Sequence, residues 1–196
     1  MSAFDREIRK EYLHSKLIIL DRDGVINKNS KSYIKNKNEW NPIEGSIKAI
    51  SRLSKHGFKI LVVTNQSGIG RGLFNKHDLD EIHLKMSSAI RSMDGHIEGI
   101  YYCPHKPEDG CNCRKPKTGL IDKIEKKLNI KVEKAILIGD SMSDIILANS
   151  INALPILLKT GNGKSTLKKL KNTDIRYLCF DNLAEATKAI LKLEML

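Results

Sequence analysis

The stretch LIILDRDG, residues 17–24, places two carboxylates, Asp21 and Asp23, directly after a short apolar run. An apolar run of this length is typical of a strand buried in a parallel sheet. In such a sheet ligands bind just outside the carboxyl ends of the strands, where Asp21 and Asp23 would lie. The two carboxylates repel each other, so we expect a cation beside them, and Mg²⁺ suits oxygen ligands and phosphate best. A solvated turn is the alternative, because Asp and Gly are ordinary turn residues.

Further apolar segments alternate with segments of helical periodicity along the chain. We predict strands at residues 17–20, 58–63, 99–102, 135–138, 154–158 and 177–180, and helices at residues 46–56, 76–93, 119–128, 144–152 and 183–193. The alternation predicts an α/β fold, a Rossmann-like parallel sheet with helices on both faces. A chain of 196 residues fits one domain, residues 1–196, with an N-terminal extension over residues 1–15. Phe4, Ile8 and Tyr12 have the spacing of a packing helix within that extension.

Composition and charge narrow the class of partner. The longest apolar stretches are strand-sized and residues 1–16 carry charges throughout, so we expect a cytoplasmic protein without a membrane partner. The formal net charge of +11 is compatible with nucleic-acid binding, but the lysines are spread along the chain and aromatic residues make up only 5%. We therefore expect a monomer that acts on a small phosphorylated molecule and not on nucleic acid.

Three of the four cysteines fall within residues 103–113, beside a histidine. In a cytoplasmic protein this grouping indicates a metal and not disulfides. Cys103, His105, Cys111 and Cys113 can fill all four positions of a tetrahedral Zn²⁺, which argues for a structural ion. Free buried cysteines with a chance histidine are the alternative. Cys179 lies in a separate apolar segment, where we expect a buried strand thiol.

Three more polar clusters follow predicted strands or lie next to them. Since the carboxyl ends of parallel strands meet at one sheet edge, we expect these clusters to converge with Asp21 and Asp23 on one crevice. Phosphate-monoester hydrolysis needs a nucleophile, an acid, a metal and hydrogen-bond donors to the phosphate together, and the chain offers residues for each of these roles. The clusters are Thr64-Asn65-Gln66-Ser67, Arg114-Lys115 and Gly139-Asp140.

The residue types suggest a division of roles. Asp21 can attack phosphorus to give an aspartyl-phosphate, while Asp23 protonates the leaving alkoxide and later activates water. Asp140 would complete a Mg²⁺ site with Asp21 and the backbone carbonyl of Asp23. The Thr64 hydroxyl with neighbouring backbone N–H groups can hold phosphoryl oxygens, and Lys115 can balance charge in the transition state.

Arg114 is suited to a bidentate contact with phosphate or with a hydroxylated substrate. Taken one at a time, these residues also fit turns, a helix N-cap or solvated charges. The phosphatase interpretation therefore depends on their combination.

The motifs DRDGVIN (21–27), TNQSGIGRGLF (64–74), CPHKPEDGCNCRKP (103–116) and GDSMSD (139–144) resemble those of the haloacid dehalogenase superfamily. They are most similar to the D-glycero-D-manno-heptose 1,7-bisphosphate 7-phosphatase family, and the resemblance spans residues 17–166. It implies a phosphatase without a large cap domain, with a zinc loop at residues 103–113, that serves nucleotide-activated heptose synthesis for lipopolysaccharide or other glycoconjugates. It also implies substrate contacts from Asn65, Gln66, Ser67, Arg71 and Arg114.

The sequence departs from the family at Asn29 and Lys31, where acidic residues are frequent, and at Ser141, where some members have Lys. Histidinol-phosphate phosphatase is the enzymatic alternative, since that sister family has a similar zinc loop. The loop QSGIGRG, residues 66–72, favours the heptose branch, because Arg71 and the glycine backbone suit a second anionic or hydroxylated substrate end. A zinc-stabilised nucleic-acid-binding module is the more distant alternative, and it leaves Asp21, Asp23 and Asp140 unexplained.

Overall fold

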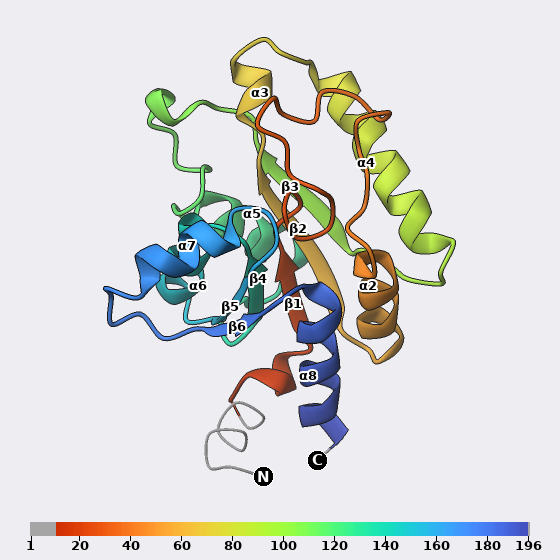
Figure 1. Cartoon of the computed structure of the whole chain (residues 1–196), viewed down its shortest axis with the longest axis vertical. Helices are drawn as coiled ribbons and strands as arrows, with labels where there is room; N and C mark the ends of the chain where they lie inside the picture. Colours follow the sequence, from red (N-terminus) through yellow and green to blue (C-terminus); the bar gives the residue numbers. More distant parts are fainter. Residues whose placement is uncertain (1–10, 196) are drawn as a thin grey trace.

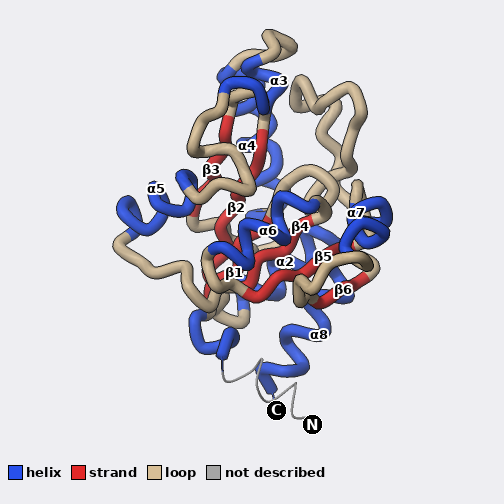
Figure 2. The backbone as a smooth tube through the Cα atoms, turned by 90° about the vertical axis from the view of Figure 1, so that its left-hand side faces the viewer, coloured by secondary structure: helices blue, strands red, loops and turns tan. Residues whose placement is uncertain are grey.

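The computed structural model describes residues 11–195, so the predicted packing of Phe4 and Ile8 lies outside the described residues. Within this range all strands belong to one parallel sheet with the order β3-β2-β1-β4-β5-β6. Figure 2 shows these strands side by side between the helices. The sheet confirms the predicted Rossmann-like α/β fold. The strands are β1 (Leu17–Leu20), β2 (Lys59–Asn65), β3 (Gly99–Cys103), β4 (Ile136–Gly139), β5 (Leu154–Leu158) and β6 (Leu178–Phe180).

Helices cover both faces of the sheet, as predicted (Figure 1). One face is covered by α2 (Ser46–Lys55), α4 (Lys76–Arg91) and α8 (Leu183–Met195), and the other by α5 (Gly119–Leu128), α6 (Met142–Ser150) and α7 (Gly163–Leu170). The short α3 (Ser67–Gly70) and the 3-10 turns η1 (Leu13–Ser15) and η2 (Pro107–Asp109) lie in connections. Neither α3 nor α7 was predicted from the sequence, because α3 has only four residues and α7 is rich in Lys and begins at a glycine.

The alternation of side chains along the strands divides the core into two main clusters. Ile18 and Leu20 of β1 face the cluster that includes α2, α4 and α8, whereas Leu17 and Ile19 face the cluster that includes α5 and α6. Every residue of β1 is buried. This double coverage explains why the strand is a continuous apolar run and ends where the first carboxylate begins.

Two long irregular connections stand at the carboxyl ends of the strands. The first, residues 21–45, joins β1 to α2, and the second, residues 104–118, joins β3 to α5 and includes η2 (Figure 1). The polar groups that follow the strands are therefore presented between these two loops at one edge of the sheet.

No helix in residues 11–195 is long and apolar enough to cross a bilayer.

Candidate active site

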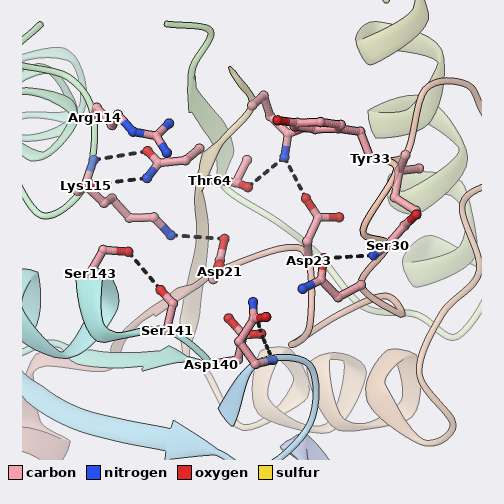
Figure 3. Close-up of a pocket in the computed structure, with 15 residues that line it drawn as sticks. Asp21, Asp23, Ser30, Tyr33, Thr64, Arg114, Lys115, Asp140, Ser141 and Ser143 are labelled. Atoms are coloured by element: carbon pink, nitrogen blue, oxygen red, sulfur yellow. Dashed lines mark hydrogen bonds and ion pairs between the residues drawn. The ribbon is translucent and has the colours of Figure 1, made fainter. Parts of the chain in front are cut away.

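A pocket of about 250 Å³ lies at the point where the strand order reverses, between β1 and β4. In doubly wound sheets this switch point is where ligands bind. The close-up shows side chains from the ends of several strands turned toward one space (Figure 3). The pocket-lining residues that the sequence predicted are Asp21, Asp23, Thr64, Asn65, Gln66, Arg114, Lys115 and Asp140.

Asp21 follows β1 and is fixed on both its backbone and its side chain. Its backbone N–H donates to Ile138 O at 2.9 Å, and its Oδ1 accepts from the Arg22 N–H at 2.7 Å. The same oxygen lies 3.0 Å from Lys115 Nζ. Burial raises the pKa of Asp21 to about 6, against the opposing charge of Lys115 and with the help of nearby carboxylates.

Asp140 follows β4 and is 1% exposed. Its Oδ2 accepts from the backbone N–H of Asn162 at 2.6 Å and from the Asn162 side-chain amide at 3.2 Å. Gly24 and Gly161 both have positive φ, and a Cβ on either would meet Asp140 Oδ2 at 2.1 Å. Glycine is therefore required twice around this carboxylate. Burial, followed by the charge of Asp21, raises the pKa of Asp140 to about 8.

The arrangement of carboxylates fits a divalent cation. Oxygen atoms of Asp21, Asp140 and Asp144 all lie within 4.8 Å of one another. With Asp23, four carboxylates lie beside only two cations, Lys115 and Arg22. Burial is the largest cause of the raised pKa values of Asp21 and Asp140, and the excess of carboxylates adds negative charge to it. A hard cation with oxygen ligands, such as Mg²⁺, would relieve it.

Lys115 comes from the second long connection and is inserted into the site with 4% of its surface exposed. Its Nζ donates to Val63 O at 2.7 Å and lies 2.6 Å from Asp144 Oδ1 as well as beside Asp21. Burial would lower the pKa of Lys115, but the carboxylates of Asp144 and Asp21 raise it above its ordinary value. The lysine is therefore a fixed positive charge next to the candidate nucleophile.

Asn65 holds the backbone of Lys115 by two reciprocal hydrogen bonds. Its Oδ1 accepts from the Lys115 N–H at 3.0 Å, and its Nδ2 donates to the Lys115 carbonyl at 3.2 Å. Asn65, the last residue of β2, thus positions Lys115 in the loop that follows β3.

Asp23 lies on the side of Asp21 that faces away from Lys115, and amide and guanidinium donors hold its carboxylate (Figure 3). Gln66 Nε2 donates to Asp23 Oδ2 at 2.8 Å and to Thr64 Oγ1 at 2.9 Å, while Asn27 Nδ2 donates to Asp23 Oδ1 at 2.8 Å. Burial alone would raise the pKa of Asp23, but Arg22, Asn27 and Gln66 together hold it below its usual value. Because Thr64 accepts from Gln66, its own hydroxyl proton remains to be donated into the pocket.

The cysteine cluster has the geometry of a tetrahedral metal site. Its sulfur–sulfur distances are 3.3, 3.5 and 3.6 Å, and His105 Nδ1 lies 3.2 Å from Cys113 Sγ and 3.7 Å from Cys103 Sγ. A tetrahedron with Zn–S bonds of about 2.3 Å has edges of about 3.8 Å, so the ligands are already gathered. The donor set, Cys103, His105, Cys111 and Cys113, fits zinc as the sequence predicted. Cys179 lies on β6 and is half-buried instead of buried.

Two predicted substrate contacts lie outside the described lining of the pocket. Ser67 is buried at the start of α3, and Arg71 Nη2 lies 3.6 Å from Glu108 Oε2 of the zinc loop. Arg114 does line the pocket and donates to the carbonyl of His105 at 3.3 Å, which links it to the zinc ligands.

The sequence analysis did not predict Asp144 and Asn162 as site residues. Asp144 is the last residue of the motif GDSMSD, and it forms a capping box with Ser141 at the start of α6. Asn162 lies in a polar loop soon after β5, so the rule that found Asp140 could also have found it.

This fold and site define a phosphoric monoester hydrolase of the haloacid dehalogenase type. The model of the polynucleotide kinase 3 phosphatase family matches residues 16–182. The chain belongs to the D-glycero-D-manno-heptose-1,7-bisphosphate 7-phosphatase family.

Relatives of that name support the assignment over most of their lengths. The protein of Pseudomonas putida is 43% identical over 176 residues, which cover 90% of this chain and 99% of the relative. That of Neisseria meningitidis is 46% identical over 154 residues, 79% and 82% of the two chains.

Solved structures agree in fold. The D,D-heptose 1,7-bisphosphate phosphatase of B. bronchiseptica, crystallised with magnesium and phosphate, superposes with a TM-score of 0.85 at 38% identity, covering 90% of this chain and 98% of the other. The enzyme of the same name from Burkholderia thailandensis gives a TM-score of 0.69 at 32% identity, with coverages of 89% and 97%.

Proposed function

We propose that this protein removes the 7-phosphate of D-glycero-β-D-manno-heptose 1,7-bisphosphate, as one step in the synthesis of nucleotide-activated heptose. The observation that carries the proposal is the convergence of Asp21, Asp23, Lys115 and Asp140 on one pocket, in a chain whose relatives are named for this substrate. A small sugar phosphate suits a pocket of about 250 Å³.

The reaction proceeds in two displacements at phosphorus. An oxygen of Asp21 attacks the 7-phosphate, the bond between phosphorus and the sugar oxygen breaks, and Asp23 gives its proton to that oxygen. Asp23 then takes a proton from water, the water oxygen attacks phosphorus, and inorganic phosphate leaves Asp21. Asp23 is ionised before substrate binds. The negative phosphate beside it raises its pKa, so that it takes up a proton from solvent and then gives that proton to the leaving oxygen.

The remaining groups stabilise the transferring phosphoryl group. Asp21, Asp140 and the backbone carbonyl of Asp23 would hold Mg²⁺, which when bound neutralises charge on the phosphoryl oxygens. Lys115 contributes a fixed positive charge next to Asp21, and the Thr64 hydroxyl donates a hydrogen bond. Magnesium and phosphate in the B. bronchiseptica relative support this assignment.

Arg114 is the cation best placed for the other end of the substrate. It lines the same pocket as Asp21 but projects from the loop of the zinc ligands. A guanidinium can contact the second phosphate with two parallel hydrogen bonds. Arg71 pairs with Glu108 in a half-exposed ion pair outside the described pocket lining, and its contact with the substrate stays a prediction.

A substrate comparison tests the proposal. Phosphate release with Mg²⁺ is measured from the α- and β-anomers of heptose 1,7-bisphosphate, histidinol phosphate and an oligonucleotide with a 3′-phosphate. The proposal predicts the highest kcat/KM on the β-bisphosphate. Faster turnover of histidinol phosphate or of the oligonucleotide would contradict it.

A further inference from the structure

Arg22, the residue between the two catalytic aspartates, is turned away from solvent. It is 0% exposed and does not line the pocket within the described chain. Its guanidinium donates hydrogen bonds to the carboxylate of Asp23: Nε lies 3.2 Å from Oδ1, and Nη2 lies 3.0 Å from Oδ1 and 2.9 Å from Oδ2. Nη2 also donates to Gln66 Oε1 at 3.0 Å. A rigid fork of this kind fixes a carboxylate in orientation as well as in position.

The remaining nitrogen of Arg22 meets a residue from outside the motifs. His83, in the middle of α4, is 8% exposed, and its Nε2 lies 3.4 Å from Arg22 Nη1. Burial and then the charge of Arg22 lower the pKa of His83 to about 3, so the ring is neutral at ordinary pH. A neutral ring whose proton is on Nδ1 accepts at Nε2, so we assign that tautomer, with Arg22 as donor.

Burying a cation has a large desolvation cost, which well-packed apolar residues of similar size would avoid. The guanidinium of Arg22 makes its hydrogen bonds to Asp23, Gln66 and His83. Gln66 in turn bonds to both Asp23 and Thr64. The network therefore connects Asp23, which transfers the proton, to Thr64, which donates a hydrogen bond to the phosphate, and it extends to α4.

We propose that His83 and Arg22 form a positioning pair that holds the carboxylate of Asp23 in line with the leaving oxygen of the substrate. The inference depends on the proposed function, because it assigns the pair a role in the proton transfer by Asp23. Neither residue touches the substrate. Small displacements of a reacting group can lower a rate by about 10²-fold, so loss of the pair should slow the step that needs Asp23.

The leaving group separates this role from a merely structural one. An alkyl phosphate such as heptose bisphosphate needs a proton on its leaving oxygen, whereas 4-nitrophenyl phosphate releases a stable anion and needs little acid catalysis. Displacing Asp23 should therefore slow formation of the aspartyl-phosphate from the alkyl substrate and spare it from the aryl substrate. The measurement is kcat/KM, because the later attack of water, in which Asp23 is the base for both substrates, does not enter that constant. Damage to the pocket as a whole would slow both equally.

The experiment compares three variants on both substrates, with folding checked by circular dichroism. His83→Leu removes the nitrogen that accepts from Arg22, and His83→Gln keeps a hydrogen-bond acceptor near the position of Nε2. His77→Leu is the control, because it makes the same His-to-Leu change at an exposed histidine of α4. We expect His83→Leu to lower kcat/KM on heptose bisphosphate by about tenfold, and on 4-nitrophenyl phosphate by less than about twofold. His83→Gln should recover most of the loss, and His77→Leu should match the wild type.

Arg22→Lys extends the test, since lysine keeps the charge without the fork. It should lower kcat/KM on the alkyl substrate by about 10²-fold with the same sparing of the aryl substrate. If it does not fold, the His83 variants decide alone. Equal losses on both substrates, or no loss in His83→Leu, would overturn the positioning pair.

A wild-type enzyme that is inactive on heptose bisphosphate would contradict the proposed function instead. The comparison would then use whichever alkyl phosphate the enzyme hydrolyses. A wild type that hydrolyses no phosphate ester would overturn both proposals.

Discussion

Lys115 Nζ lies 2.6 Å from Asp144 Oδ1, and the two side chains are only 3% and 0% exposed. The contact joins the loop that carries the zinc ligands to the first turn of α6. It also leaves Asp21, the candidate nucleophile, to share the lysine with a second carboxylate. This buried pair connects the stability of the loop to the charge balance of the site.

Asp144→Asn should lower the free energy of unfolding by about 3 kcal/mol, because it leaves the buried ammonium of Lys115 with fewer compensating charges. Urea denaturation measures the change. Asp174→Asn is the matched control at an exposed loop position and should change stability by less than about 0.5 kcal/mol. Equal midpoints and slopes for Asp144→Asn and wild type would show that the buried pair contributes nothing.

Mg²⁺ should stabilise the protein through Asp21 and Asp140. Burial, with the charges of neighbouring carboxylates added to it, raises both pKa values, and a bound cation offsets that cost. At a Mg²⁺ concentration of about 100 times Kd, the free energy of unfolding should rise by about 2.7 kcal/mol. Thermal unfolding with and without Mg²⁺ measures this gain. Asp140→Asn should lose most of it, and a variant that kept the full gain would exclude Asp140 as a ligand.

Removing one zinc ligand should disorder the loop that presents Arg114 and Lys115. Cys113→Ser, or extraction of zinc with a chelator, should lower kcat/KM by at least about tenfold, since structural zinc contributes about 10–16 kcal/mol. Metal content and phosphate release are measured together. Cys179→Ser is the control, because that thiol lies on β6 outside the cluster. Full activity of the zinc-free protein would show that the cysteine cluster does not support the active site.

His83 should make stability depend on pH. Its folded pKa of about 3 lies below its ordinary value of 6.5, so between these values the unfolded chain binds more protons and stability falls as the pH falls. From about pH 7 to about pH 4 the loss should be about 3 kcal/mol. Denaturation across this range is compared for wild type and His83→Leu, in which the loss attributable to this ring should vanish. Parallel pH curves for the two proteins would mean that His83 is not buried in its neutral form.

Part of the site could be predicted because its residues follow strands directly. Asp21, Thr64 and Asp140 occupy strand ends or the next position, and the parallel topology brings such positions together whatever the details of packing. The zinc ligands could be predicted because the residue types are rare and close in sequence. These inferences need only the order of elements.

The rest depends on how helices and loops pack. Asp144 and His83 reach the site from α6 and α4, and helical periodicity marks them as inward-facing without showing which groups they meet. Arg71 was predicted as a substrate contact from a glycine-rich loop, and its Nη2 lies 3.6 Å from Glu108 Oε2. Because loop sequences do not specify the direction of a side chain, that contact stays a prediction. The predicted helix at residues 144–152 begins two residues earlier, at Met142, because Ser141 and Asp144 form a capping box.

Trapping of the phosphorylated protein shows whether Asp21 attacks phosphorus. Wild type and Asp21→Asn are mixed with heptose 1,7-bisphosphate and Mg²⁺, quenched in acid, and analysed by mass spectrometry while phosphate release is followed in parallel. We expect an acid-stable phosphoryl adduct on Asp21 in the wild type, and in Asp21→Asn no adduct and a fall in kcat of more than about 10³-fold. An unchanged rate in Asp21→Asn, or an adduct on another residue, would contradict it.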